Sequence, residues 1–124
     1  MKLYSVNEVL ENKESLHGQR IYIEGLLSYD VEDVSLLHWP KAEQSEIGIW
    51  IEESNGAFKY SFESLDNLAG KKVVCLGEFQ SSSEADTFDG EWGFGHMSLW
   101  PAQLIATELV YYKKWQEANG IFKT

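Results

Sequence analysis

The sequence predicts a mainly β domain, a five-stranded Greek-key barrel with an N-terminal helix and a short helix between the third and fourth strands. Apolar and polar residues alternate in several short segments, which is the period of half-buried strands. A glycine-containing motif that ends a helix and enters a strand occurs twice. The chain of 124 residues has the usual length of one domain, so we expect a single domain over residues 1–124.

The first predicted element is a helix over residues 5–16. Ser5 is a suitable N-cap residue, and Glu8 follows three positions later, which is the capping-box pattern. The apolar face of this helix contains Val6, Val9 and Leu10. We expect His17-Gly18 to end the helix.

Five strands are then expected, over residues 20–30, 34–39, 47–52, 72–79 and 97–112. Further helical segments are expected over residues 62–68 and 113–117. In the third strand, Ile47, Ile49 and Ile51 are expected to face the interior, while Trp50 and Glu52 face outward, because side chains alternate along a strand.

Two segments of the chain resemble each other. One is Leu16-x-Gly18-x-Arg20-Ile21-x-Ile23-x-Gly25, and the other is Leu68-x-Gly70-x-Lys72-Val73-x-Cys75-x-Gly77. In each, a helix ends before a glycine, a basic residue follows, and an alternating strand reaches a second glycine. Glycine within a strand indicates a bulge or a sharp bend, so we expect both strands to bend and close a barrel.

This order of elements, together with the segment from Leu16 to Gly25, resembles the small bacterial OB-type domains of the oligonucleotide/oligosaccharide-binding superfamily. The resemblance covers residues 5–110 in pattern, and it implies an OB-like barrel. It also implies that ligands bind at the outer face of the second and third strands and at the loops that join the first strand to the second and the fourth to the fifth. The motif consists of structural residues, so it indicates fold and no specific function. An SH3-like barrel and an α+β roll are the alternative folds.

The charge of the chain argues against binding to a polyanion. Twenty acidic and ten basic residues give a net charge of −10. Residues 21–58 contain one basic residue, Lys41, and residues 73–112 contain no Lys or Arg. Nucleic-acid affinity depends on neutralising phosphates with Lys and Arg, so nucleic acid is the less favoured partner.

We expect a cytoplasmic protein. The sequence contains no apolar run of the roughly 20 residues that span a bilayer, and its first residues turn polar early, so we expect neither a membrane partner nor a signal peptide. The single cysteine, Cys75, lies between Val74 and Leu76 and is expected to be a buried thiol in a reducing compartment.

The longest predicted loop, residues 80–96, joins the fourth and fifth strands and has an acidic half and an aromatic half. Long loops of this kind often bind ligands, but the aromatic half would equally fill one end of the barrel. The tryptophans expected to face outward on the strands, Trp39, Trp50 and Trp100, are the other candidates. The predicted binding residues are Trp39, Trp50, Asp86, Asp89, Glu91, Trp92, Phe94 and His96.

No catalytic, metal or cofactor site is predicted. Asp86-x-x-Asp89-Gly90-Glu91 lacks the ligand spacing of a calcium loop, and the three histidines are far apart in the sequence. The chain has no nucleophile elbow, phosphate loop or dinucleotide fingerprint. We therefore expect a protein that is not an enzyme, and an active site assembled only in the fold is the alternative.

The leading functional hypothesis is a non-enzymatic binding module, an acidic interaction or inhibitor/immunity-type protein that recognises a basic protein partner. The alternative is an OB-type single-stranded nucleic-acid-binding protein. That alternative requires a basic stripe on the aromatic face, formed by Arg20, Lys71, Lys72, Lys113 and Lys114. A binder of carbohydrates or other small molecules is a third hypothesis. A homodimer is also open, through an exposed edge expected between the third and fifth strands.

Overall fold

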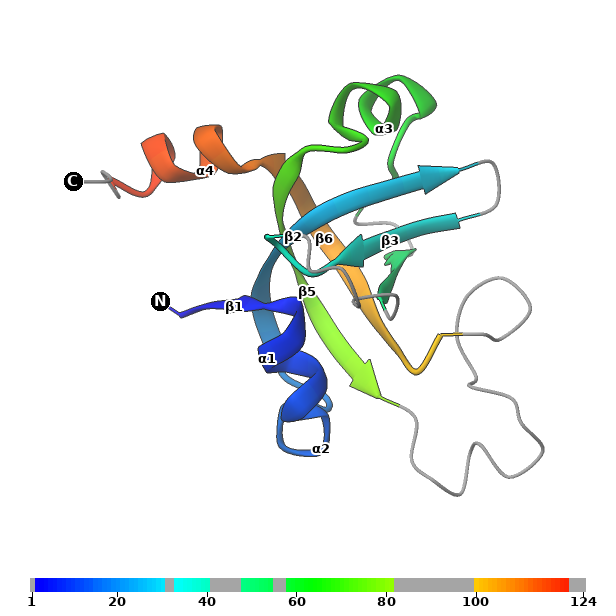
Figure 1. Ribbon diagram of the computed structural model, residues 1–124, viewed down its shortest axis with the longest axis vertical. Helices are drawn as coiled ribbons and strands as arrows, with labels where there is room; N and C mark the ends of the chain where they lie inside the picture. Colours follow the sequence, from blue (N-terminus) through cyan, green and yellow to red (C-terminus); the bar gives the residue numbers. More distant parts are fainter. Residues whose placement is uncertain (1, 31–32, 41–47, 55–57, 82–99, 121–124) are drawn as a thin grey trace.

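The computed structural model describes residues 2–30, 33–40, 48–54, 58–81 and 100–120 (Figure 1). Its strands are β1 (Leu3–Ser5), β2 (Arg20–Asp30), β3 (Asp33–Leu37), β4 (Ile49–Glu53), β5 (Lys72–Ser81) and β6 (Ala102–Tyr111). Its helices are α1 (Val6–Glu11), α2 (Lys13–Leu16), α3 (Phe62–Leu68) and α4 (Tyr112–Ala118). Among the described residues, no helix is both long enough and apolar enough to cross a bilayer.

Five strands form a closed barrel in the order β2–β3–β4–β6–β5, and β5 pairs back onto β2. Neighbouring strands in this ring are antiparallel except β4 and β6, which are parallel, and α3 lies between β4 and β5 in the chain. The predicted fold class, an OB-like Greek-key barrel, is confirmed. The expected exposed edge between the third and fifth strands is wrong, because β4 and β6 pair there from Trp50 and Gln103 to Glu53 and Ala106.

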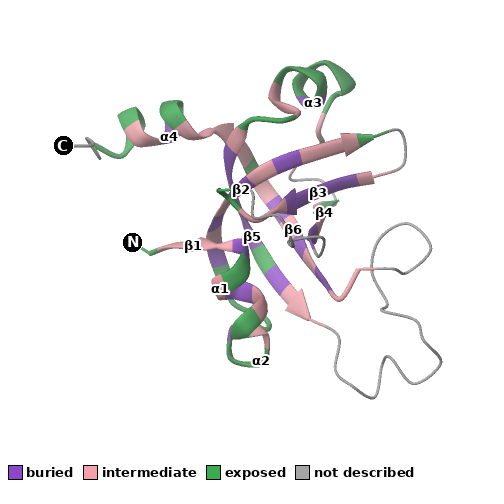
Figure 2. Cartoon of the chain, in the orientation of Figure 1, coloured by how far each residue is buried: buried purple, intermediate pink, exposed green. Residues whose placement is uncertain are grey.

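The barrel interior is filled mainly by aliphatic side chains, together with the aromatic ring of Phe79, which is the largest fully buried side chain among the described residues. Ile49 and Ile51 of β4 face this interior and are fully buried, as predicted, and Ile47 lies outside the described residues. Figure 1 shows α3 at one end of the barrel and the α1–α2 pair at the other, and Figure 2 shows the buried residues between them. The helices α1, α2 and α3 contribute Val6, Val9, Leu16 and Leu65 to the core.

The N-terminal segment differs from the prediction in two ways. The capping box of Ser5 and Glu8 is present, but the expected single helix is divided at Asn12, whose backbone leaves helical geometry. The Asn12 side-chain Nδ2 donates to the Glu8 carbonyl at 2.8 Å and so caps the end of α1. The short strand β1, which was not predicted, runs parallel to the first half of β2.

The two resembling segments lie against each other. β2 and β5 are antiparallel, with Ile23 opposite Cys75. The turn after α2 hydrogen-bonds to the C-terminal part of β5, and the turn after α3 hydrogen-bonds to the C-terminal part of β2. The Gly18 N–H donates to the Phe79 carbonyl at 2.7 Å, and the Gly70 N–H donates to the Leu27 carbonyl at 2.8 Å. Both glycines have positive φ, 81° and 77°, a conformation that costs little only for glycine. The two copies of the motif are therefore related by a local pseudo-two-fold axis that passes near the pair of Ile23 and Cys75.

Gly77, the last glycine of the second segment, lies in close contact with the backbone of β6. A Cβ atom at this position would overlap the Ile105 carbonyl and lie 2.9 Å from the Ala106 Cα atom. The pairing shifts register between Leu76 and Gly77, and Thr107 is the extra residue of a bulge in β6.

We predict that Gly77→Ala lowers the free energy of unfolding by about 3 kcal/mol or more, since backbone must move to admit the methyl group. Gly70→Ala is the matched control, because a Cβ there meets nothing within 4 Å and only the positive φ is unfavourable. Its cost should be about 1 kcal/mol. Urea denaturation measures both values, and equal losses would contradict the close approach at Gly77.

Candidate functional site

The outward side chains of β4, β6 and β5 form two rows across the barrel. Paired residues on neighbouring strands point to the same side of a sheet, so the register defines each row. The first row is Trp50–Gln103–Gln80, and the second is Glu52–Ile105–Glu78. We call this surface, with Trp100 beside it, the tryptophan face: Trp50, Glu52, Glu78, Gln80, Trp100, Gln103 and Ile105.

Two indole rings form the centre of the tryptophan face. The ring centroids of Trp50 and Trp100 are 4.9 Å apart, and the planes are tilted by 59°. The Trp50 Nε1–H donates to Glu52 Oε2 at 2.9 Å, which fixes the orientation of this ring. Both tryptophans are partly exposed, so the pair offers apolar ring surface next to a carboxylate.

A chain of side-chain hydrogen bonds extends the tryptophan face across β6 and β5. Gln103 Nε2 donates to Gln80 Oε1 at 2.6 Å, and Gln80 Nε2 donates to Glu78 Oε2 at 3.0 Å. These bonds hold the amide groups in place and leave the Glu78 carboxylate exposed at the end of the chain. The face therefore combines an aromatic pair with two carboxylates, those of Glu52 and Glu78.

Tyr60 lies near the acidic end of β4. Its backbone N–H donates to Glu53 Oε2 at 3.1 Å, and its hydroxyl lies 3.5 Å from the Ile51 carbonyl. Burial, with smaller contributions from the charges of Glu53 and Glu52, raises the pKa of Tyr60 to about 12.

Four lysines gather at a different corner of the barrel, where β5 begins and α4 follows β6. We call this group the lysine corner: Lys71, Lys72, Lys113 and Lys114. The Lys72 ammonium lies 3.8 Å from the ring centroid of Tyr112 and 3.4 Å from Glu24 Oε2. The Lys71 ammonium lies 5.8 Å from the ring centroid of Tyr111.

A second apolar layer covers the outside of the barrel beneath α4. The outward side chains of β2, β5 and β6 form the rows Tyr22–Leu76–Glu108 and Glu24–Val74–Val110. Val74, Leu76 and Trp115 of α4 are buried, although they lie outside the main core cluster. The Trp115 ring lies 6.0 Å from that of Tyr22 and stacks on that of Tyr112 at 6.3 Å.

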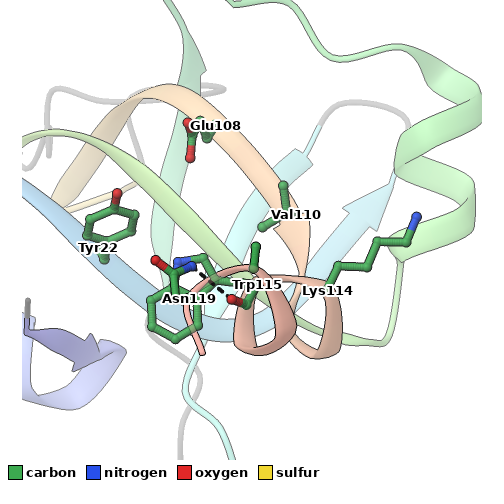
Figure 3. A pocket seen from close by; sticks show the side chains of 7 residues that line it. Tyr22, Glu108, Val110, Lys114, Trp115 and Asn119 are labelled. Atoms are coloured by element: carbon green, nitrogen blue, oxygen red, sulfur yellow. Dashed lines mark hydrogen bonds between the residues drawn. The ribbon is translucent and has the colours of Figure 1, made fainter. Parts of the chain in front are cut away.

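A pocket of about 390 Å³ opens beside Trp115 (Figure 3). Its walls are formed by Tyr22, Glu108, Val110, Lys114, Trp115, Ala118 and Asn119. Asn119 Nδ2 donates to the Trp115 carbonyl at 2.8 Å, which leaves the amide oxygen of Asn119 free to accept. The buried indole N–H of Trp115 has no hydrogen-bond partner among the described residues. We call this the α4 pocket.

The bulge at Thr107 allows β6 to take part in both surfaces. Before the bulge, Gln103 and Ile105 face outward, and after it, Glu108 and Val110 face outward. A shift of one residue exchanges the two faces of a strand, so the extra residue reverses the alternation. Thr107 Oγ1 donates to the Leu76 carbonyl at 3.3 Å and accepts from Arg20 Nη2 at 3.1 Å.

The structure separates the two predicted binding residues that it describes. Trp50 lies on the tryptophan face with Trp100, whereas Trp39, 36 % exposed, lies 5.9 Å from the Lys72 ammonium at the lysine corner. The other predicted residues, Asp86, Asp89, Glu91, Trp92, Phe94 and His96, lie outside the described residues. In the described part of the chain, no three His, Cys, Asp or Glu side chains gather as a metal site.

Cys75 is fully buried, as predicted, and burial raises the pKa of its thiol. The α4 pocket was not predicted. One signal for it exists in the sequence, the uninterrupted apolar run from Val73 to Leu76, because a strand buried on both faces does not alternate. No protein-family model matches the chain, and no curated protein matches it significantly.

We predict that Tyr60 makes the free energy of unfolding fall as the pH rises from about 10 to 12. In the unfolded chain Tyr60 ionises near its ordinary pKa of 10, so in this range the unfolded state binds fewer protons than the folded state. Urea denaturation of the protein and of Tyr60→Phe across this range measures the effect. The variant should show a shallower decline, and equal slopes would contradict the raised pKa.

Proposed function

We propose that this chain is a non-enzymatic binding module of the OB type, and that its tryptophan face recognises a basic protein partner. The observation that carries the proposal is the partly exposed pair of Trp50 and Trp100, with the carboxylates of Glu52 and Glu78 in the adjoining row. The proposal includes a cytoplasmic location, to which the buried free thiol of Cys75 is suited.

The chemistry of the tryptophan face supports this choice of partner. Tryptophan is enriched among the residues that carry most of the binding energy at protein interfaces. The two carboxylates and the net charge of −10 would attract a basic partner and accelerate its encounter. One version is an inhibitor or immunity-type protein that covers the basic active site of a nuclease, with carboxylates where phosphates would bind.

The second candidate function is binding of single-stranded nucleic acid, and the lysine corner favours it. Lysines beside Tyr111 and Tyr112 provide the charge and the aromatic rings that such sites use. Three observations favour the first candidate instead. Lys72 is already paired with Glu24, Arg20 is bonded to Thr107, and along β5 the lysine corner begins eight residues, about 26 Å, from Gln80 of the tryptophan face.

We predict that a basic protein is recovered with this chain from a lysate of its source cell and remains bound after nuclease treatment. The double variant Trp50→Ala/Trp100→Ala should weaken that complex by a factor of about 100 or more, because hot-spot tryptophans contribute several kcal/mol. Phe62→Ala is the matched control, since Phe62 is 74 % exposed on α3, away from the tryptophan face, and its loss should leave binding unchanged.

The affinity of the purified chain and of each variant for the purified partner is then measured by titration calorimetry. Thermal unfolding of each variant checks that it is folded. Glu52→Gln/Glu78→Gln should slow association more than it speeds dissociation. Full binding by the tryptophan variant would refute the role of this face. Recovery of nucleic acid, with affinity for an oligonucleotide that falls steeply with salt and is lost in Lys71→Glu/Lys113→Glu, would establish the second candidate.

A further inference from the structure

The geometry points to a second site on this chain, one in which the α4 pocket binds an organic cation, an ammonium or guanidinium group, between Glu108 and the aromatic rings of Tyr22 and Trp115. The pocket volume of about 390 Å³ lies within the range of small-molecule sites. This site lies on a different part of the barrel from the tryptophan face, so either proposal can fail alone.

The protein already holds a cation in this way one row away. The Lys72 ammonium lies between a carboxylate and an aromatic ring, 3.4 Å from Glu24 Oε2 and 3.8 Å from the ring centroid of Tyr112. This arrangement combines an ion pair with a cation–π contact, the combination that proteins use to recognise organic cations.

The row Tyr22–Leu76–Glu108 also offers a carboxylate and an aromatic ring, but no lysine or arginine of the described chain lies between them. Tyr22 and Glu108 lie on either side of Leu76, two strand spacings or about 10 Å apart at the backbone. No described Lys, Arg or His forms an ion pair with Glu108, and no described Lys or Arg lies over the ring of Tyr22. A carboxylate and a ring therefore face the pocket without an internal cation, whereas the carboxylate of the adjacent row, Glu24, is paired with Lys72.

Among the described residues that line the pocket, Lys114 is the one basic residue, and its ammonium does not oppose this assignment. Figure 3 shows its side chain extending away from Glu108 and Tyr22, so that its methylene groups line the wall while the charge lies outside. Among the other polar groups of the pocket wall, the Tyr22 hydroxyl and the free amide oxygen of Asn119 can accept hydrogen bonds from an ammonium or guanidinium, whereas the indole N–H of Trp115 is a buried donor.

The test is a titration of the full chain followed by the ¹⁵N–¹H resonances of the Trp115 indole and the Asn119 amide. The matched probes are choline and its neutral isostere 3,3-dimethyl-1-butanol, with agmatine as the guanidinium probe. Blocked arginine, N-acetyl-arginine methylamide, shows whether the same group is also accepted as part of a polypeptide. Choline or agmatine should give saturable shifts at both residues, with affinity about tenfold higher than the neutral isostere.

Three variants decide the role of each charge. Glu108→Gln should weaken choline or agmatine binding about tenfold, because it removes the attracting charge, whereas Glu117→Gln, which removes an exposed carboxylate of α4 outside the pocket wall, should not. Lys114→Met should leave cation binding unchanged or strengthen it. Thermal unfolding confirms that each variant remains folded.

Equal binding of the neutral isostere would overturn the proposal, because the pocket would then recognise only apolar shape. So would unchanged affinity in Glu108→Gln, or the absence of any saturable shift with the cations. Acetate serves as the anionic probe. Acetate binding that is lost in Lys114→Met would also overturn the proposal and identify Lys114 as the recognised charge.

Discussion

β2 hydrogen-bonds to three other strands, and its antiparallel pairing with β5 closes the barrel. The pairing is fixed at both ends in the same way, because a helix ends in a positive-φ glycine whose N–H binds the opposite strand. One register, with Ile23 opposite Cys75, therefore determines where α2 and α3 stop and which residues face the core. Every surface described above is built on that register.

The same register explains how one small barrel presents two different surfaces. On β5, alternate residues from Lys72 to Gln80 face outward, and they divide between the lysine corner, the layer beneath α4 and the tryptophan face. The bulge at Thr107 keeps β6 in step with both halves of β5, so Ile105 lies in one row with Glu52 and Glu78, and Glu108 lies in one row with Leu76 and Tyr22. The close approach at Gly77 is the structural requirement for this arrangement.

Most of the barrel could be predicted because its determinants are local. Alternation in β2 and β4, the capping box at Ser5 and the two glycine motifs each follow from a few neighbouring residues. β1 has three residues, too few to show a period, and Asn12 ends α1 by a side-chain bond that no pattern indicates. The candidate surfaces depend on register: no local signal brings Trp100 to Trp50 or separates both from Trp39.

The pairing of Ile23 with Cys75 joins positions that are 52 residues apart in the chain. Closing a loop of that size loses chain entropy before the strand contacts can compensate for it. The contact order of this barrel is accordingly high, because the two strands that close it are far apart in the chain. Folding on the slow, millisecond-to-second side of the range for small domains is therefore a consequence of its connectivity.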